Sequence, residues 1–259
     1  MTTSGQRWRI ALIAALPVVA LVFLAFRGPM RQNEVLPGYH NFADQRTLWG
    51  VPHFWNVVSN LPFILVALWG LRSAASPTAF VEHWERTAYR ILLLSVALVA
   101  LGSGYYHARP DDATLFWDRL PMAIAFMTLI ASTVGERISP RAGRLLLFPL
   151  LAAAALSVIY WRLADDLRLY ALIQFCAIAA LPLMILLFPP RYSGTAGILV
   201  MVALYCLALA LDRSDRALAP FLPTGSHPGK HLSAAAAIFA YVHTIAHRRA
   251  LPAYRHSGR

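Results

Sequence analysis

The feature that most constrains this chain is a series of eight apolar segments, each close to the length that a helix needs to cross a lipid bilayer. A spanning α-helix requires about 20 predominantly apolar residues. The breaks between the segments carry Pro, Gly, Arg and Asp, which are typical of turns at the membrane interface. The sequence therefore predicts spans at about 8–26, 54–72, 87–107, 115–134, 143–161, 168–188, 195–212 and 230–247.

The composition is that of a polytopic membrane protein and argues against a soluble domain. Hydrophobic residues make up 58% of the 259 residues, charged residues make up 14%, and the mean hydropathy is +0.55. Within a bilayer a helix satisfies all of its backbone hydrogen bonds internally. We therefore expect an all-α fold, a polytopic membrane helix bundle.

The first apolar segment has two possible interpretations. Arg7 and Arg9 precede it, as they would precede the apolar core of a cleaved signal peptide. The segment is long, however, and Arg27-Gly28-Pro29-Met30 is a poor match to the small residues of a cleavage site. We therefore predict a retained anchor helix.

The positive charge indicates orientation and membrane contact. The formal net charge is +11, and the basic residues are scattered over short loops. Eight spans put both termini on one side, with thirteen basic residues there and ten on the other. This bias favours cytoplasmic termini. The remaining charge is suited to anionic lipid headgroups, so we predict an integral multi-pass membrane protein without a nucleic-acid partner.

Polar side chains gather at the segment ends on the predicted non-cytoplasmic side. His107 ends the third segment and Asp118 opens the fourth, whereas His227 and His231 open the eighth. Because consecutive spans alternate in direction, these three points share one face. Ser103 stands one helical turn before His107. Ionisable groups at membrane depth are costly, and they therefore indicate a functional site.

The three histidines predict a catalytic zinc site. His227 and His231 project from the same side of a helix, and His107 would add a third imidazole. A fourth position would remain for water, whose pKa zinc lowers while it polarises a substrate carbonyl. Asp118 would then act as general base and acid. Ser103 would either donate a hydrogen bond to the developing oxyanion or orient the water.

Two other groups of residues have less specific interpretations. His243 and His247 form a second HxxxH pair on the last segment, roughly 18 Å from the first pair at 1.5 Å per residue. We predict that they are interfacial residues that extend toward the polar boundary. Cys176 and Cys206 lie inside apolar segments and are predicted to be small hydrophobic side chains. A metal site would therefore rely on histidine and carboxylate.

Three blocks of sequence resemble the alkaline ceramidase family, part of the CREST group of membrane hydrolases. The segment Phe54-Trp55-Asn56-Val57-Val58-Ser59-Asn60 is similar to the family's FWNxxSN block. Ser103 through His107, followed by Asp118, resembles its SxxxH and downstream Asp. His227 through His231 resembles its closing HxxxH. The three blocks occur in the family's order.

The resemblance implies a seven-helix core, which falls over 54–247 here. One extra transmembrane helix, in an anchor region over 1–53, departs from the family, and a basic tail over 248–259 follows the core. It implies zinc on the three histidines, with Ser103 and Asp118 as catalytic partners. It also implies that the partner is a ceramide-like membrane lipid, hydrolysed at its amide to a fatty acid and a sphingoid base.

The chain departs from the family before the FWN block. The family carries an acidic calcium-binding stretch there, with a Glu immediately before FWN, whereas His53 holds that position here. Asp44 is the one carboxylate between residues 44 and 49. Calcium prefers several oxygen ligands, so the resemblance gives little support to a calcium site.

Three other functions remain open on the same residues. An intramembrane serine protease would use Ser103, between Gly102 and Gly104, as nucleophile and a histidine from another helix as base. A lipid-binding receptor would hold the zinc as a structural site, although such sites usually have four protein ligands. A transporter would relay protons through His and Asp, but here the polar groups gather at one end.

Overall fold

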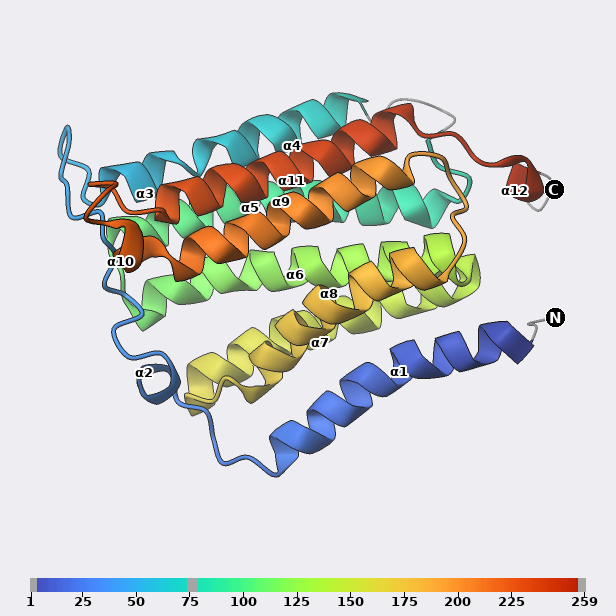
Figure 1. Cartoon of the computed structure of the whole chain (residues 1–259), viewed down its shortest axis with the longest axis horizontal. Coiled ribbons are helices and arrows are strands. Elements are labelled where there is room, and N and C mark those ends of the chain that lie inside the picture. Colours follow the sequence, from blue (N-terminus) through green and yellow to red (C-terminus); the bar gives the residue numbers. More distant parts are fainter. Residues whose placement is uncertain (1–3, 74–78, 256–259) are drawn as a thin grey trace.

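The computed structural model describes residues 4–73 and 79–255, and its regular elements are helices that run side by side along one axis (Figure 1). The predicted all-α bundle is confirmed. Residues 256–259 of the predicted basic tail lie outside the described residues. The long helices are α1 (Ser4–Ala25), α4 (Leu61–Ser73), α5 (His83–Ala108), α6 (Asp112–Arg137), α7 (Pro140–Ala164), α8 (Arg168–Leu187), α9 (Thr195–Arg213) and α11 (His227–His247), and the short ones are α2 (Gln32–Val35), α3 (Phe54–Val58), α10 (Asp215–Leu218) and α12 (Pro252–Arg255).

Seven of the described helical segments are long and apolar enough to cross a membrane, with α3 and α4 counted as one. Their outward faces are apolar as well. On α4, Leu61, Leu65, Leu68 and Leu71 are all exposed, and their spacing places them on one side of the helix. A continuous apolar outer surface of this kind suits a lipid environment. The chain is therefore a multi-pass membrane protein.

Helix α11 is not among those seven segments, because it carries more polar side chains than the others. It still runs the length of the bundle and packs against α9 and α4 (Figure 1). The predicted span at 230–247 is present as a helix that begins earlier, at His227. Its histidine and lysine residues are His227, Lys230, His231, His243 and His247.

The predicted span over 54–72 is confirmed as the candidate span Phe54–Ser73, within which a short break separates α3 from α4. The side chains of Ser59 and Asn60 donate hydrogen bonds back to the carbonyl of Asn56, at 3.1 and 2.8 Å. Such bonds compete with the helical pattern and end α3 at Val58. Pro62 then stands in the first turn of α4, where its missing N–H has little effect.

A close backbone contact joins α5 to α6. A Cβ atom at Gly102 would collide with the carbonyl of Trp117. Small residues allow membrane helices to approach in this way. Because Ser103 follows Gly102 and Asp118 follows Trp117, the same contact brings Ser103 and Asp118 together.

The two described ends of the chain lie at one end of the bundle (Figure 1). Helix α5 ends and α11 begins at the opposite end, beside the short helices α3 and α10. Helix α1 packs along α8, where the Arg9 guanidinium donates a 2.8 Å hydrogen bond to the carbonyl of Leu187. The polar residues predicted to form a site therefore lie away from both described ends of the chain.

Candidate metal centre

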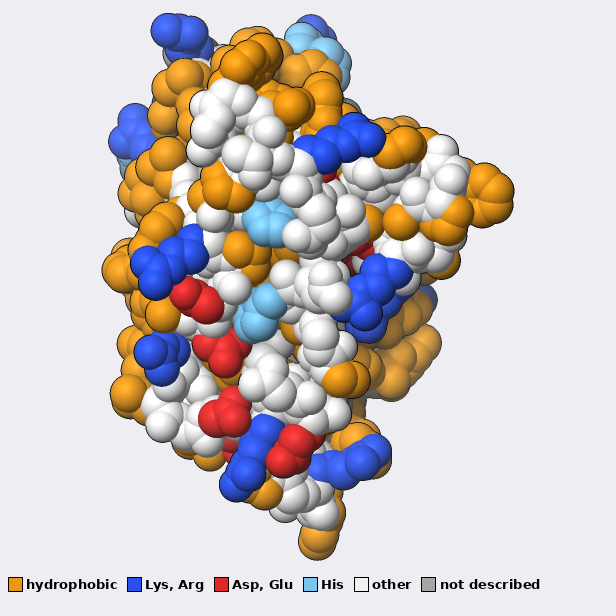
Figure 2. Space-filling view, turned by 90° about the vertical axis from the view of Figure 1, so that its left-hand side faces the viewer, with side chains coloured by type: hydrophobic (Ala, Val, Ile, Leu, Met, Phe, Trp, Pro, Cys, Tyr) orange, Lys and Arg blue, Asp and Glu red, His pale blue; other side chains and the backbone are white. Residues whose placement is uncertain are grey.

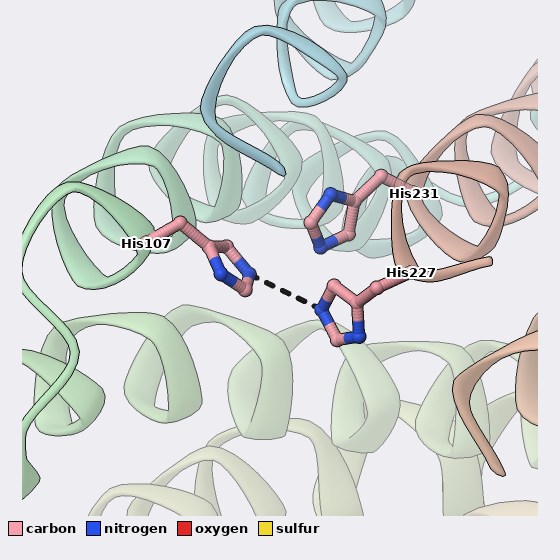
Figure 3. Close-up of side chains that lie close together, drawn as sticks. All are labelled: His107, His227 and His231. Carbon is pink, nitrogen blue, oxygen red and sulfur yellow. Dashed lines mark hydrogen bonds between the residues drawn. The ribbon is translucent and has the colours of Figure 1, made fainter. Parts of the chain in front are cut away.

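His107, from the last turn of α5, meets His227 and His231, from the first turns of α11 (Figure 3). One ring nitrogen of each lies within 4.8 Å of those of the other two. The Nε2 atoms of His107 and His227 are 3.3 Å apart. All three side chains are buried, with no more than 4% of any residue exposed. The predicted trio is thus brought together and could hold a metal ion.

Hydrogen bonds at Nδ1 fix the direction of two of these rings. The Nδ1 of His231 lies 2.8 Å from Ser59 Oγ, which itself donates to the carbonyl of Asn56. The Nδ1 of His227 lies 3.2 Å from a carboxylate oxygen of Asp212. These acceptors assign the ring proton to Nδ1 and leave the Nε2 lone pair facing the centre. Partners of this kind are typical of metal-binding histidines.

The sequence pattern did not identify Asp212 or Ser59 as site residues. Asp212 stands at the end of a predicted span, on the same face as His227, and this placement was the available signal. Its carboxylate also forms an ion pair with Lys230, with 2.9 Å between Oδ1 and Nζ. Ser59 belongs to the FWNxxSN block, but only the break after α3 shows that it contacts a histidine.

The start of α11 is tied to the neighbouring loop by Asp215. One carboxylate oxygen accepts a 2.8 Å hydrogen bond from the backbone N–H of His227, and the other accepts one from Ala43 at 2.9 Å. An acceptor at this position satisfies a helix N–H that has no partner within the helix. Phe42, next to Ala43, packs its ring against those of His107 and His227. This packing limits the access of water to the rings from that side.

Ser103 and Asp118 form a second pair of polar side chains, between α5 and α6. The Ser103 side chain lies beside the Asp118 carboxyl group, and Lys230 and Asp212 are among the charges that act on that carboxyl. Ser103 is buried. Because Asp212 also contacts His227, the pair and the three histidines belong to one polar cluster.

The second HxxxH pair lies at the far end of α11. His243 and His247 are exposed, and the Nδ1–H of His247 donates a 2.8 Å hydrogen bond to the carbonyl of His243. Neither residue belongs to the metal-ligand group found among the described residues. This placement agrees with the interfacial role predicted for them.

Asp44 has a structural role in the described chain. It is fully buried, and its carboxylate accepts hydrogen bonds from the backbone N–H groups of Trp55 at 2.8 Å and Arg46 at 3.3 Å. It therefore caps the start of α3. These bonds give no support to calcium binding at this residue.

Figure 2 shows the end of the molecule that contains the candidate metal centre. Histidine side chains reach the surface near its middle, and acidic and basic side chains surround them, with apolar side chains toward the edges. Because consecutive spans alternate in direction, nine of the twelve acidic residues of the chain lie at this end of the bundle. The polar cluster therefore lies at a wet, charged end of an otherwise apolar bundle.

The fold and the buried, converging histidines together define the class of this protein, which is a multi-pass membrane protein with a candidate metal centre. The ceramidase family model matches residues 49–248, which is most of the chain. The chain therefore belongs to the ceramidase family. Membership makes it a hydrolase that acts on the amide bond of ceramide, a membrane lipid. A search of curated proteins found no match.

Proposed function

We propose that the protein is a zinc-dependent amide hydrolase that cleaves a ceramide-like N-acyl lipid to a fatty acid and a sphingoid or similar amine. The meeting of His107, His227 and His231 is the observation that carries the proposal. In a tetrahedral zinc site with Zn–N bonds of 2.0–2.1 Å, two ligand nitrogens lie about 3.3 Å apart. The Nε2 atoms of His107 and His227 are separated by 3.3 Å.

The protein residues then divide the remaining work. Zinc on three imidazoles supplies Lewis acidity and lowers the pKa of a water at its open position. The Asp118 carboxylate accepts a proton from the attacking water and passes it to the departing amine nitrogen. Ser103, which lies beside Asp118, orients that carboxylate or donates to the developing oxyanion.

An apolar cavity of about 160 Å³ offers a place for a hydrocarbon chain of the substrate. Met122, one turn after Asp118, and Ala234, one turn after His231, both line it. The cavity therefore starts beside the polar cluster and continues into the bundle. Ile178 also lines it and is exposed on the outer surface, so a lipid could enter sideways from the membrane.

The arrangement favours the zinc hydrolase over the serine protease. Among the described residues, Ser103 lies beside the carboxyl group of Asp118 and forms no hydrogen bond with an imidazole, whereas the three imidazoles face one another. A serine nucleophile needs a base such as an imidazole within hydrogen-bond reach. We also propose that residues 1–53 form an anchor region outside the catalytic domain, and that the catalytic end faces the non-cytoplasmic side.

Metal content and activity, measured together on the purified protein, test the proposal. We expect about one zinc per wild-type chain, retained in His243→Ala and lost in His107→Ala, His227→Ala and His231→Ala. We expect Asp118→Asn to keep its zinc but to lose at least 100-fold in ceramide hydrolysis, the scale of general acid–base catalysis.

Two results would contradict this function. Wild-type protein that is free of zinc after purification without chelators, yet active, would remove the metal from the mechanism. Covalent labelling of Ser103 by a fluorophosphonate, with activity that ignores chelators, would favour the serine protease instead.

A further inference from the structure

A second cavity lies at the end of the bundle opposite the candidate metal centre. It has a volume of about 470 Å³ and is lined by residues that include Trp84, Arg141, Arg144 and Arg191. Trp84 stands at the start of α5, whose last turn carries His107. At 1.5 Å per residue the helix places the two roughly 35 Å apart. The cavity is therefore separate from the hydrolytic site.

Three arginines and one carboxylate line this cavity. Arg191 is 3% exposed and forms an ion pair with Glu82, which also lines the cavity, at 3.6 Å. It forms a second ion pair, at 3.8 Å, with Glu85, which is not among the lining residues. Arg141 and Arg144 are exposed, and neither forms an ion pair with any residue that the structure describes. The cavity therefore carries excess positive charge.

Buried N–H donors at the cavity have no hydrogen-bond partner. Arg191 Nε and Trp84 Nε1 are both shielded from solvent and unpaired within the described part of the chain. Both distances from Arg191 to its carboxylates exceed the usual length of a hydrogen bond. Buried donors are nearly always satisfied in native proteins, so this pair indicates an acceptor that is supplied from outside the chain.

The first turn of α7 offers one backbone donor, the N–H of Arg141, because Pro140 has no N–H and Ser139 Oγ already accepts from the N–H of Ala142. Ser139 caps this helix, Pro140 follows it, and both line the cavity. The N-terminus of a helix favours anions, because its N–H groups and its dipole point toward them. An anion with several acceptor oxygens, such as a phosphate, matches arginine donors in both charge and geometry.

The surface next to the cavity indicates that the phosphate belongs to a lipid. Leu145 and Phe148 follow Arg144 on α7, and they are 60% and 65% exposed. An acyl chain could lie along them while the headgroup phosphate sits at the arginines. Basic pockets between membrane helices bind anionic headgroups in this way.

We propose that this cavity is a binding site for the phosphate headgroup of an anionic phospholipid. Arg141 and Arg144 form its outer wall, and Arg191 and Trp84 supply donors at its base. Because the site lies at the opposite membrane face, the lipid acts as a bound structural partner and not as the substrate.

Calorimetric titration of delipidated full-length protein in a neutral detergent tests the site. The probes are dioctanoyl phosphatidylglycerol, its zwitterionic phosphatidylcholine counterpart and inorganic phosphate. We expect one phosphatidylglycerol per chain, bound at least tenfold more tightly than phosphatidylcholine. The double variant Arg141→Gln/Arg144→Gln should lose at least tenfold in affinity for it. Binding should also weaken with added salt, because the outer arginines are exposed.

The matched control is Arg72→Gln/Arg90→Gln, which removes two exposed arginines from the same end without touching the cavity lining. Its affinity should stay within twofold of wild type, and ceramide hydrolysis should be unchanged in both double variants. An equal loss in the two double variants, or equal binding of both phospholipids by the wild type, overturns the site. Inorganic phosphate that binds as tightly as phosphatidylglycerol overturns the lipid assignment.

Discussion

At the scale of single residues, the candidate metal centre depends on side chains that are not themselves ligands. Asp212 and Ser59 hold the Nδ1 atoms of His227 and His231, so each ring presents Nε2 to the other imidazoles. Lys230 in turn pairs with Asp212 at 2.9 Å. Such outer contacts set the tautomer and the orientation of a histidine ligand.

Replacing Asp212 by Asn should weaken zinc binding by about 10- to 100-fold, because the side chain keeps its shape but loses the charge that holds His227. Competition with a fluorescent zinc chelator would measure the change. Asp112→Asn is the control, because Asp112 lies at the same end of the bundle but pairs with His40. Equal zinc affinity in Asp212→Asn and wild type would show that the carboxylate does not support the ligand.

The sequence was most informative where spacing along one helix decides the geometry. His227 and His231 meet because residues four apart share a helix face, and alternating spans bring His107 to the same end. Asp212 and Ser59 could not be predicted in the same way. Their contacts depend on how α9 and the break after α3 pack against α11, and spacing along the chain does not encode that packing.

At the scale of helices, the contact between α5 and α6 positions the proposed catalytic pair. Gly102 allows the backbone of α5 to reach the carbonyl of Trp117, and the adjacent residues Ser103 and Asp118 then meet. In the sequence, Gly102-Ser103-Gly104 suggested the small-residue surroundings of a nucleophilic serine. In the structure, Gly102 has a packing role instead.

Gly102→Ala should destabilise the protein by about 1–3 kcal/mol and reduce hydrolysis, because the added methyl group forces α5 away from α6. Gly104→Ala is the matched control, since a Cβ there meets nothing within 4 Å. Thermal unfolding in detergent and ceramide turnover would compare the two. If both variants behaved alike, the close approach would not be what positions Ser103 and Asp118.

A second junction between elements joins the loop after α1 to the turn before α8. Burial raises the pKa of Asp166, but hydrogen bonds from Arg168, Met30 N–H and Tyr160 more than offset this and lower it to about 2. A carboxylate whose pKa is lower in the folded chain than in the unfolded chain, where it is about 3.9, stabilises the fold at pH values above the unfolded pKa. That contribution disappears as the pH falls toward 2.

Asp166→Asn should therefore lower the melting temperature at pH 6, and its difference from wild type should shrink as the pH falls from about 4 to about 2. Thermal unfolding in detergent across this range would show the trend. A difference that stayed constant with pH would mean that the charge of Asp166 contributes nothing to the junction.

At the scale of the whole molecule, the bundle has two unlike ends. The three histidines and most carboxylates lie at one end, and both described chain ends lie at the other. The number and order of the long helices could be predicted from the apolar segments of the sequence, although α11 is less apolar than the seven candidate spans. The side of the membrane on which each end lies depends on a modest excess of arginine, and it remains a prediction.

A reporter fused after Arg259 tests this orientation. Green fluorescent protein at this position should fluoresce in a bacterial host, and alkaline phosphatase should be inactive, because the terminus is expected in the cytoplasm. The opposite pair of results would place the candidate metal centre on the cytoplasmic side and the basic cavity on the other.

Helix α11 follows the other long helices in the chain, carries two of the three histidines of the centre, and is less apolar than the seven candidate spans. A segment with histidines and a lysine enters a bilayer more readily when earlier helices already offer it polar partners, as Asp212 and Ser59 do here. During synthesis, His107 is therefore made before His227 and His231, which belong to the last long helix of the chain. A chain without α11 has only one of these three histidines, so the candidate metal centre is complete only when this last long helix joins the bundle.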